Sequence, residues 1–204
     1  MVQPILDYLK RTYAPEAILL YGSFANGTNN AHSDFDALLI ADAPEGHDTS
    51  TVAGVVLDVW VYPPETFSGH FAPEDFVQIF DGRIVLDKYG TAARVQQEVQ
   101  AYLQSLPTPG DEENRQNLAW CQKMMTRTTR GDAEGYYRWH WLLTESLQIY
   151  CDIRHQHYFG PKKALRWMQE HAPEDFACYQ HALCAFTQEA LEGWMACMAR
   201  ALEG

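Results

Sequence analysis

The sequence predicts an α+β protein in which a small mixed β-sheet domain is followed by an all-α helical bundle. Two observations support this order. Short apolar runs typical of strands fall in the first half of the chain, at residues 17–21, 36–40, 55–62 and 83–87. After residue 110 the strand signals end and helical periodicity takes over. Strands followed by helices indicate an α+β fold or two domains.

The boundary between the two parts is predicted at residues 107–110, PTPG, because proline and glycine interrupt regular structure. We therefore expect a first domain over residues 1–106 and a helical, substrate-binding domain over 111–204. Within the first domain, residues 4–13 and 91–106 have helical periodicity.

The remaining segments are assigned by the same patterns. The polar stretch DAPEGHDTS, residues 42–50, is predicted to be a loop. In the second domain we expect long helices over residues 132–158 and 179–202. The first of these carries an apolar stripe made of Tyr136, Trp139, Leu143, Leu147 and Tyr150. His155 and His157 are two apart on that predicted helix, so they are not expected to form a metal pair.

The charge is strongly negative and unevenly distributed. The chain has a formal net charge of −12, of which residues 1–106 carry −9, with 5 Lys+Arg against 14 Asp+Glu. This acidity argues against nucleic acid as a partner, because binding a polyanion depends on Lys and Arg. Residues 123–166 form a local basic island. An acidic domain and a basic island suit a metal–triphosphate site between two lobes, and they equally suit two solvated faces.

Cysteine usage and hydropathy predict a cytoplasmic protein without a membrane segment. The five cysteines are odd in number and form no CxxC pair, which favours reduced thiols over disulfides or a zinc site. No apolar run approaches the roughly 20 residues that span a bilayer. The N-terminal segment is typical of an amphipathic helix and not of a signal peptide.

The most informative segment is residues 19–40. A predicted buried strand ends at Gly22-Ser23, where glycine permits close backbone approach and the following N–H groups can meet a phosphate. Next, Ser33 precedes Asp34 and Asp36, which open the second strand and point to the same face. Two close carboxylates repel each other unless a cation lies between them, and Mg²⁺ prefers such hard oxygen ligands. The pair could instead be a solvated rim.

A third carboxylate, Asp58, lies in the otherwise apolar strand VVLDVWV. A buried, unpaired carboxylate there would cost several kcal/mol, so we expect a partner or a metal for it. If this strand lies beside the second, Asp58 completes a cluster that can hold two metals roughly 3.5–4 Å apart. Alternatively, Asp58 is an ordinary edge residue.

Together, Gly22-Ser23, Gly27, the Ser33–Asp36 segment and Asp58 resemble the motif of the nucleotidyltransferase superfamily that includes DNA polymerase beta. The resemblance covers about residues 17–62. It implies that Asp34, Asp36 and Asp58 are catalytic metal ligands for two Mg²⁺ or Mn²⁺ ions. It also implies that Gly22, Ser23 and Ser33 contact the phosphates of a nucleoside triphosphate.

The order of the two domains resembles the small-molecule branch of that superfamily, such as the enzymes that modify aminoglycosides or lincosamides. This resemblance implies transfer of NMP, most simply AMP from ATP, to a hydroxyl of a small-molecule acceptor, with release of pyrophosphate. Two alternatives stay open: an antitoxin-type AMP transferase that modifies protein, and a non-catalytic nucleotide-binding protein. The sequence does not give the acceptor, the base preference or the oligomeric state.

Five residues of the helical half are considered for a functional role. Glu145 is a candidate general base, or else part of a solvated stripe. Lys162 and Lys163 begin a predicted helix, where cations are disfavoured, so a triphosphate could account for them. Arg166 and His171 have the loose Arg–His spacing of HEPN ribonucleases, a spacing that also arises by chance in helices.

Overall fold

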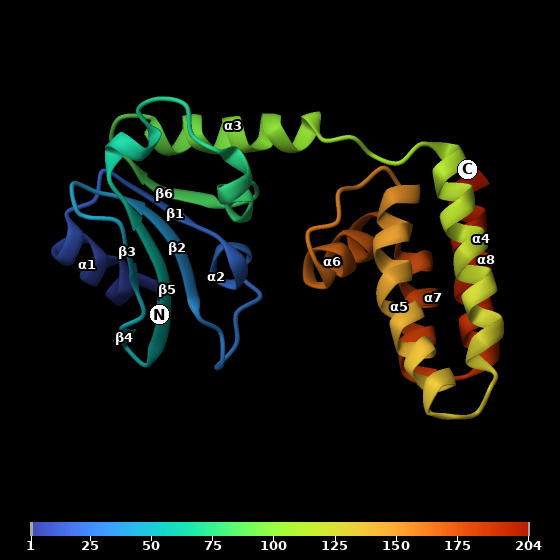
Figure 1. The fold of residues 1–204 in the computed structure, drawn as a ribbon. Helices are drawn as coiled ribbons and strands as arrows, with labels where there is room; N and C mark the ends of the chain where they lie inside the picture. Colours follow the sequence, from blue (N-terminus) through green and yellow to red (C-terminus); the bar gives the residue numbers. More distant parts are fainter. Residues whose placement is uncertain (1, 204) are drawn as a thin grey trace. The chain divides into compact units, whose positions relative to one another are not determined.

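The computed structural model describes residues 2–203, whose contacts divide them into two compact units, with the division between Leu106 and Pro107. In the described part of the chain, every strand lies in the first unit and the second unit is helical (Figure 1). The predicted α+β class is therefore confirmed. Among residues 2–203, none of the helices combines the length and the apolarity that a membrane crossing requires.

The first unit is a mixed six-stranded sheet with helices. Its elements are α1 (Val2–Tyr13), β1 (Ala17–Leu20), α2 (Gly22–Asn26), β2 (Phe35–Ile40), β3 (Gly46–Asp48), β4 (Thr51–Val52), β5 (Val55–Tyr62), the 3₁₀ helices η1 (Pro64–Phe67) and η2 (Pro73–Ile79), β6 (Arg83–Asp87) and α3 (Thr91–Ser105). The strand order is β3-β5-β2-β1-β6, and β4 pairs with β5. β2 and β5 run parallel, whereas the other pairs are antiparallel.

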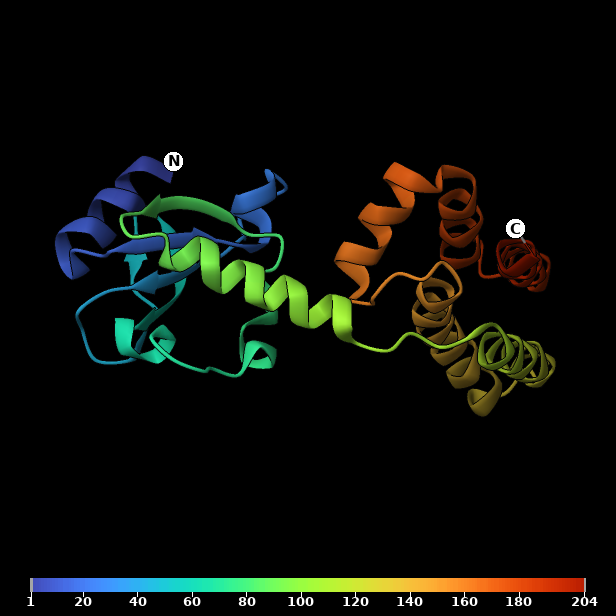
Figure 2. The ribbon, with the colours of Figure 1, turned by 90° about the horizontal axis from the view of Figure 1, so that it is seen from above.

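The two faces of the sheet are covered by different elements. On one face, alternate residues of β2 and β5, such as Phe35 and Leu57, join α1 in a buried core. Because strand side chains alternate, the residues between them point to the opposite face. There Tyr62 contacts Phe67 and Phe76 of the 3₁₀ helices. Figure 2 shows α1, in dark blue, and the blue-green 3₁₀ segments on opposite sides of the strands.

The loop predicted over residues 42–50 is wrong in part, because it contains β3. This strand pairs with β5 even though its sequence, Gly-His-Asp, has no apolar residue. Polar contacts replace apolar packing: Asp48 is buried and accepts hydrogen bonds from the hydroxyls of Tyr8 and Tyr13 and from the N–H of Ser50. Three residues with such composition give no strand periodicity, so the sequence pattern missed them.

The second unit is a bundle of five helices within the described residues. They are α4 (Asp111–Thr128), α5 (Ala133–Ile153), α6 (Pro161–His171), α7 (Pro173–Ala185) and α8 (Gln188–Glu203). α4 packs on α5 and α8, and α7 packs on α8. The core contains the predicted Trp139, Leu143, Leu147 and Tyr150 of the α5 stripe, whereas Tyr136 is 51% exposed, so its place in the stripe was wrong.

Two helix bounds in this unit differ from the prediction. The helix expected over residues 132–158 ends at Ile153, and His155 beyond it has a left-handed backbone with φ +53°. His155 and His157 therefore do not lie on a helix, and the argument from their helical spacing does not hold. The helix expected over residues 179–202 is interrupted at Phe186, whose φ of +50° is incompatible with a continuous α-helix.

Candidate active site

Two of the predicted carboxylates lie side by side. β2 and β5 are parallel neighbours, and their register pairs Asp36 directly with Asp58. Both residues are half-buried and face away from the α1 core. Tyr21 lies close to both of them: burial, together with the charges of Asp58 and Asp36, raises the pKa of Tyr21 well above its usual value. The sheet thus brings together two acids that are 22 residues apart in sequence.

Gly22 shapes the site through its missing side chain. Its φ of +65° is left-handed, and a Cβ atom added to it would lie 2.2 Å from Oδ2 of Asp36. Any other residue would therefore combine an unfavourable backbone with a clash. The sequence predicted a close approach to glycine by a phosphate. The structure shows a close approach by the Asp36 carboxylate, which the Gly22 turn accommodates.

Asp58 has a side-chain partner, as the sequence predicted, but it is not buried as the apolar strand suggested. Its side chain is 43% exposed, and its Oδ1 lies 2.6 Å from Nε2 of His47. The strand looked wholly apolar, but only alternate residues such as Leu57 and Val59 are buried, while Val56 is exposed. His47 was missed because it lies on β3, in the segment predicted to be a loop.

The donor chemistry of the pair fits a hard divalent cation. Carboxylate oxygens are the side-chain ligands that Mg²⁺ and Mn²⁺ prefer, and two adjacent carboxylates repel each other without a cation. Within residues 2–203, no three His, Cys, Asp or Glu side chains are already arranged as a metal site. The structure thus places two carboxylates side by side, and metal binding by them, with Asp34 as a third ligand, stays a prediction.

A family model described as a nucleotidyltransferase domain matches residues 2–86, which span this carboxylate pair and the Gly22 turn. Residues 2–86 form a nucleotidyltransferase domain. This part of the chain therefore belongs to the nucleotidyltransferase superfamily, and the domain indicates an enzyme of that class, for which NMP transfer is the general activity.

The chain is similar to the solved structure of a nucleotidyltransferase-like protein from Exiguobacterium sibiricum 255-15, with 10% identity and a TM-score of 0.37 over 99% of this chain and 73% of the other. No curated protein sequence matches the chain.

The other predicted residues of the nucleotidyltransferase domain lie near the start of β2 and in α2. Asp34 is exposed and immediately precedes β2. Ser33 is half-buried, and its hydroxyl accepts a hydrogen bond from the N–H of Asn30, so it shapes the turn before the strand. Ser23 is buried in α2. Phosphate contacts by Ser23 and Ser33 stay predictions.

The remaining candidates lie in the helical unit. Glu145 is half-buried on α5, near Cys121, and burial together with this carboxylate raises the pKa of Cys121 to about 12. Lys162, which is exposed, and Lys163, which is half-buried, lie in the first turn of α6, as predicted. On the same helix, His171 stacks on Trp167 and its Nδ1 lies 3.0 Å from the Trp167 carbonyl oxygen. Their roles towards a substrate stay predictions.

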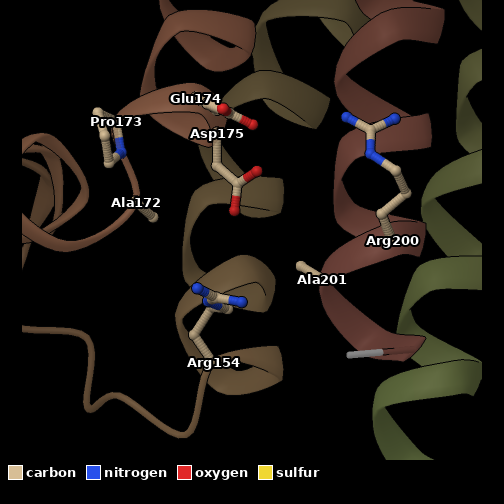
Figure 3. Close-up of a pocket in the computed structure, with 7 residues that line it drawn as sticks. All are labelled: Arg154, Ala172, Pro173, Glu174, Asp175, Arg200 and Ala201. Atoms are coloured by element: carbon tan, nitrogen blue, oxygen red, sulfur yellow. The ribbon is translucent and has the colours of Figure 1, made fainter.

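The helical unit also has a pocket of about 360 Å³ that sequence reasoning did not find (Figure 3). Arg154 and Arg200 line it, together with the start of α7. Asp175, also in its wall, accepts hydrogen bonds from the hydroxyl of Tyr150 at 2.5 Å and from the thiol of Cys197 at 3.0 Å. These contacts join α5, α7 and α8, so Asp175 has a structural part in the bundle. Glu145 and the two lysines do not line this pocket.

Proposed function

We propose that this protein transfers an NMP, most simply AMP from ATP, to a hydroxyl of a small-molecule acceptor and releases pyrophosphate. The observation that carries the proposal is the direct pairing of Asp36 with Asp58 on parallel strands, next to the Gly22 turn. The matched domain supplies the general activity. The nucleotide base, the metal and the acceptor class are parts of the proposal.

Each residue of the site has a distinct role in this proposal. Asp36 and Asp58, with Asp34 before β2, would hold divalent metal, two Mg²⁺ or Mn²⁺ ions, through their carboxylate oxygens. Metal held there would supply positive charge to the triphosphate. The backbone at Gly22 and Ser23, with Ser33, orients the phosphates. Phosphate binding by Lys162 and Lys163 of α6 stays a separate prediction.

The chemical step is a substitution at the α-phosphorus. The acceptor oxygen forms a bond to phosphorus, the bond from phosphorus to the pyrophosphate oxygen breaks, and pyrophosphate leaves with that electron pair. The hydroxyl proton passes to a carboxylate, since a base within hydrogen-bonding reach assists such a transfer. Asp58 and Glu145 are the two candidates for this base.

The charge distribution supports a cationic acceptor. The nucleotidyltransferase unit carries a net charge of −9 over residues 1–106. A negative surface raises the encounter rate of a positively charged substrate and disfavours nucleic acid. The proposed acceptor is therefore a small, positively charged molecule that bears hydroxyl groups. The proposed location of the protein is the cytoplasm.

Incubation of the purified protein with α-labelled NTPs tests the proposal. Aminoglycosides, neutral polyols and candidate proteins serve as acceptors, and the Asp36→Ala variant is the control. We expect a metal-dependent, labelled small-molecule product with wild type and none with the variant. A labelled protein band would replace the small-molecule acceptor with a protein acceptor. Nucleotide binding without any labelled product would contradict the proposed catalytic activity.

A further inference from the structure

We propose that His47 is a positioning residue for Asp58, and that Trp60 orients His47 in turn. This inference rests on the proposed function, because it concerns a ligand of the proposed metal site. It adds a residue that the nucleotidyltransferase motif of this chain does not contain. His47, Asp58 and Trp60 come from the two adjacent strands β3 and β5.

The strand register places the three side chains on one face. His47 is the direct cross-strand partner of Trp60, and Asp58 lies two residues before Trp60 on β5. Direct and diagonal cross-strand neighbours are within reach of long and aromatic side chains. The His47 ring stacks on the indole of Trp60, with centroids 4.3 Å apart and planes 7° from parallel. Its Nε2 lies 2.6 Å from Oδ1 of Asp58.

The hydrogen bond fixes one oxygen of Asp58. An ionised carboxylate only accepts, so Nε2 of His47 is the donor in this pair. Among the described residues, the hydrogen-bond partner of the Asp58 side chain is His47. Held through Oδ1, the carboxylate keeps one orientation beside Asp36, and Oδ2 is left for a cation. Carboxylates that bind metal are commonly oriented by a second hydrogen-bonded group in this way.

The opposite face of β3 fixes the strand that presents His47. Asp48 follows His47 and points the other way, where the hydroxyls of Tyr8 and Tyr13 donate to it at 3.2 and 3.0 Å. A slip of one residue would move Asp48 out of these bonds and turn His47 away from Asp58, because side chains alternate along a strand. α1 thereby holds β3 in the register that the site needs.

A contact that only stabilises the fold explains this arrangement less well than a positioning role does. The two side chains are 37% and 43% exposed, and pairs at that exposure contribute little to folding. The donor is aimed at the one carboxylate that the parallel register pairs with Asp36. We therefore expect loss of His47 to change metal and nucleotide binding much more than folding.

Two matched variants separate the hydrogen bond from the stacked ring. His47→Phe keeps a ring against Trp60 and removes the donor. His47→Gln removes the ring and keeps an N–H donor of similar reach. The readout is Mn²⁺ affinity, measured by the paramagnetic resonance of free Mn²⁺ in the presence of a non-hydrolysable ATP analogue. Urea unfolding of each variant serves as the control for folding.

We expect His47→Phe to weaken Mn²⁺ binding about tenfold and His47→Gln to recover most of that loss, with both variants as stable as wild type. Wild-type affinity in His47→Phe, or equal losses in both variants, would overturn the inference. So would a loss of affinity that only follows a loss of stability. If Asp36→Ala abolishes Mn²⁺ binding while His47→Phe does not, the proposed function stands and the inference fails. If wild type itself binds no Mn²⁺ with the analogue, both fail.

Discussion

Replacement of Gly22 with alanine tests how the Gly22 turn and Asp36 fit together. Alanine at φ +65° costs about 1–2 kcal/mol in backbone energy alone. Its Cβ would also lie 2.2 Å from Oδ2 of Asp36, so the carboxylate has to move by about 1 Å to reach a tolerable contact. A displacement of that size in a catalytic group can lower the rate about a hundredfold. We therefore expect Gly22→Ala to lose activity as well as stability.

Gly90→Ala is the matched control for the backbone term. Gly90 has φ +78°, and a Cβ atom there meets nothing within 4 Å. We expect both variants to lose about 1–2 kcal/mol of unfolding free energy in urea titrations, with a further loss only for Gly22→Ala. Metal-dependent nucleotide binding should fall only in Gly22→Ala. Equal stability losses together with unchanged nucleotide binding in Gly22→Ala would refute the reasoning.

Three further predictions address single residues. Burial and Asp48 raise the pKa of Tyr13 to about 12, so the stabilising contribution of Tyr13 is complete below pH 10 and lost as pH rises through 12. In urea titrations across that window, the unfolding free energy should fall less for Tyr13→Phe than for wild type. Equal falls in the two proteins would contradict this prediction. Asp58→Asn should change the unfolding free energy by less than about 1 kcal/mol, since its contact with His47 is exposed, whereas a loss of several kcal/mol would make Asp58 a structural residue. Glu145→Gln should lower kcat and leave the KM for NTP unchanged if Glu145 is the base; full activity would leave that role to Asp58 or water.

The sequence was sufficient to predict the elements that carry strong periodicity. The strands at residues 55–62 and 83–87 were predicted at their observed bounds, and α1 was predicted to within two residues. These segments bury apolar side chains, and burial is what produces the alternation or the helical period. The order of strands and helices then followed, and with it the fold class.

Features that depend on tertiary contacts could not be predicted in this way. β3 is held by cross-strand pairing and by the hydrogen bonds of Asp48, so local sequence gives no strand signal for it. His47 was missed with it, since only the register of β3 on β5 brings it to Asp58. The exposure of Asp58 was also misjudged. Large apolar neighbours such as Trp60 suggested that the whole strand is buried, but Trp60 and Asp58 share a face on which both remain partly exposed.

The most direct test of the central claim is calorimetric titration of a non-hydrolysable NTP analogue with and without Mg²⁺. The claim is that Asp36 and Asp58, paired across β2 and β5, form the metal-dependent nucleotide site. We expect wild type to bind the analogue only with Mg²⁺ or Mn²⁺, and Asp36→Ala to bind it at least about a hundredfold more weakly, a loss of about 3 kcal/mol. Equal binding with and without metal, retained in Asp36→Ala, would contradict the account.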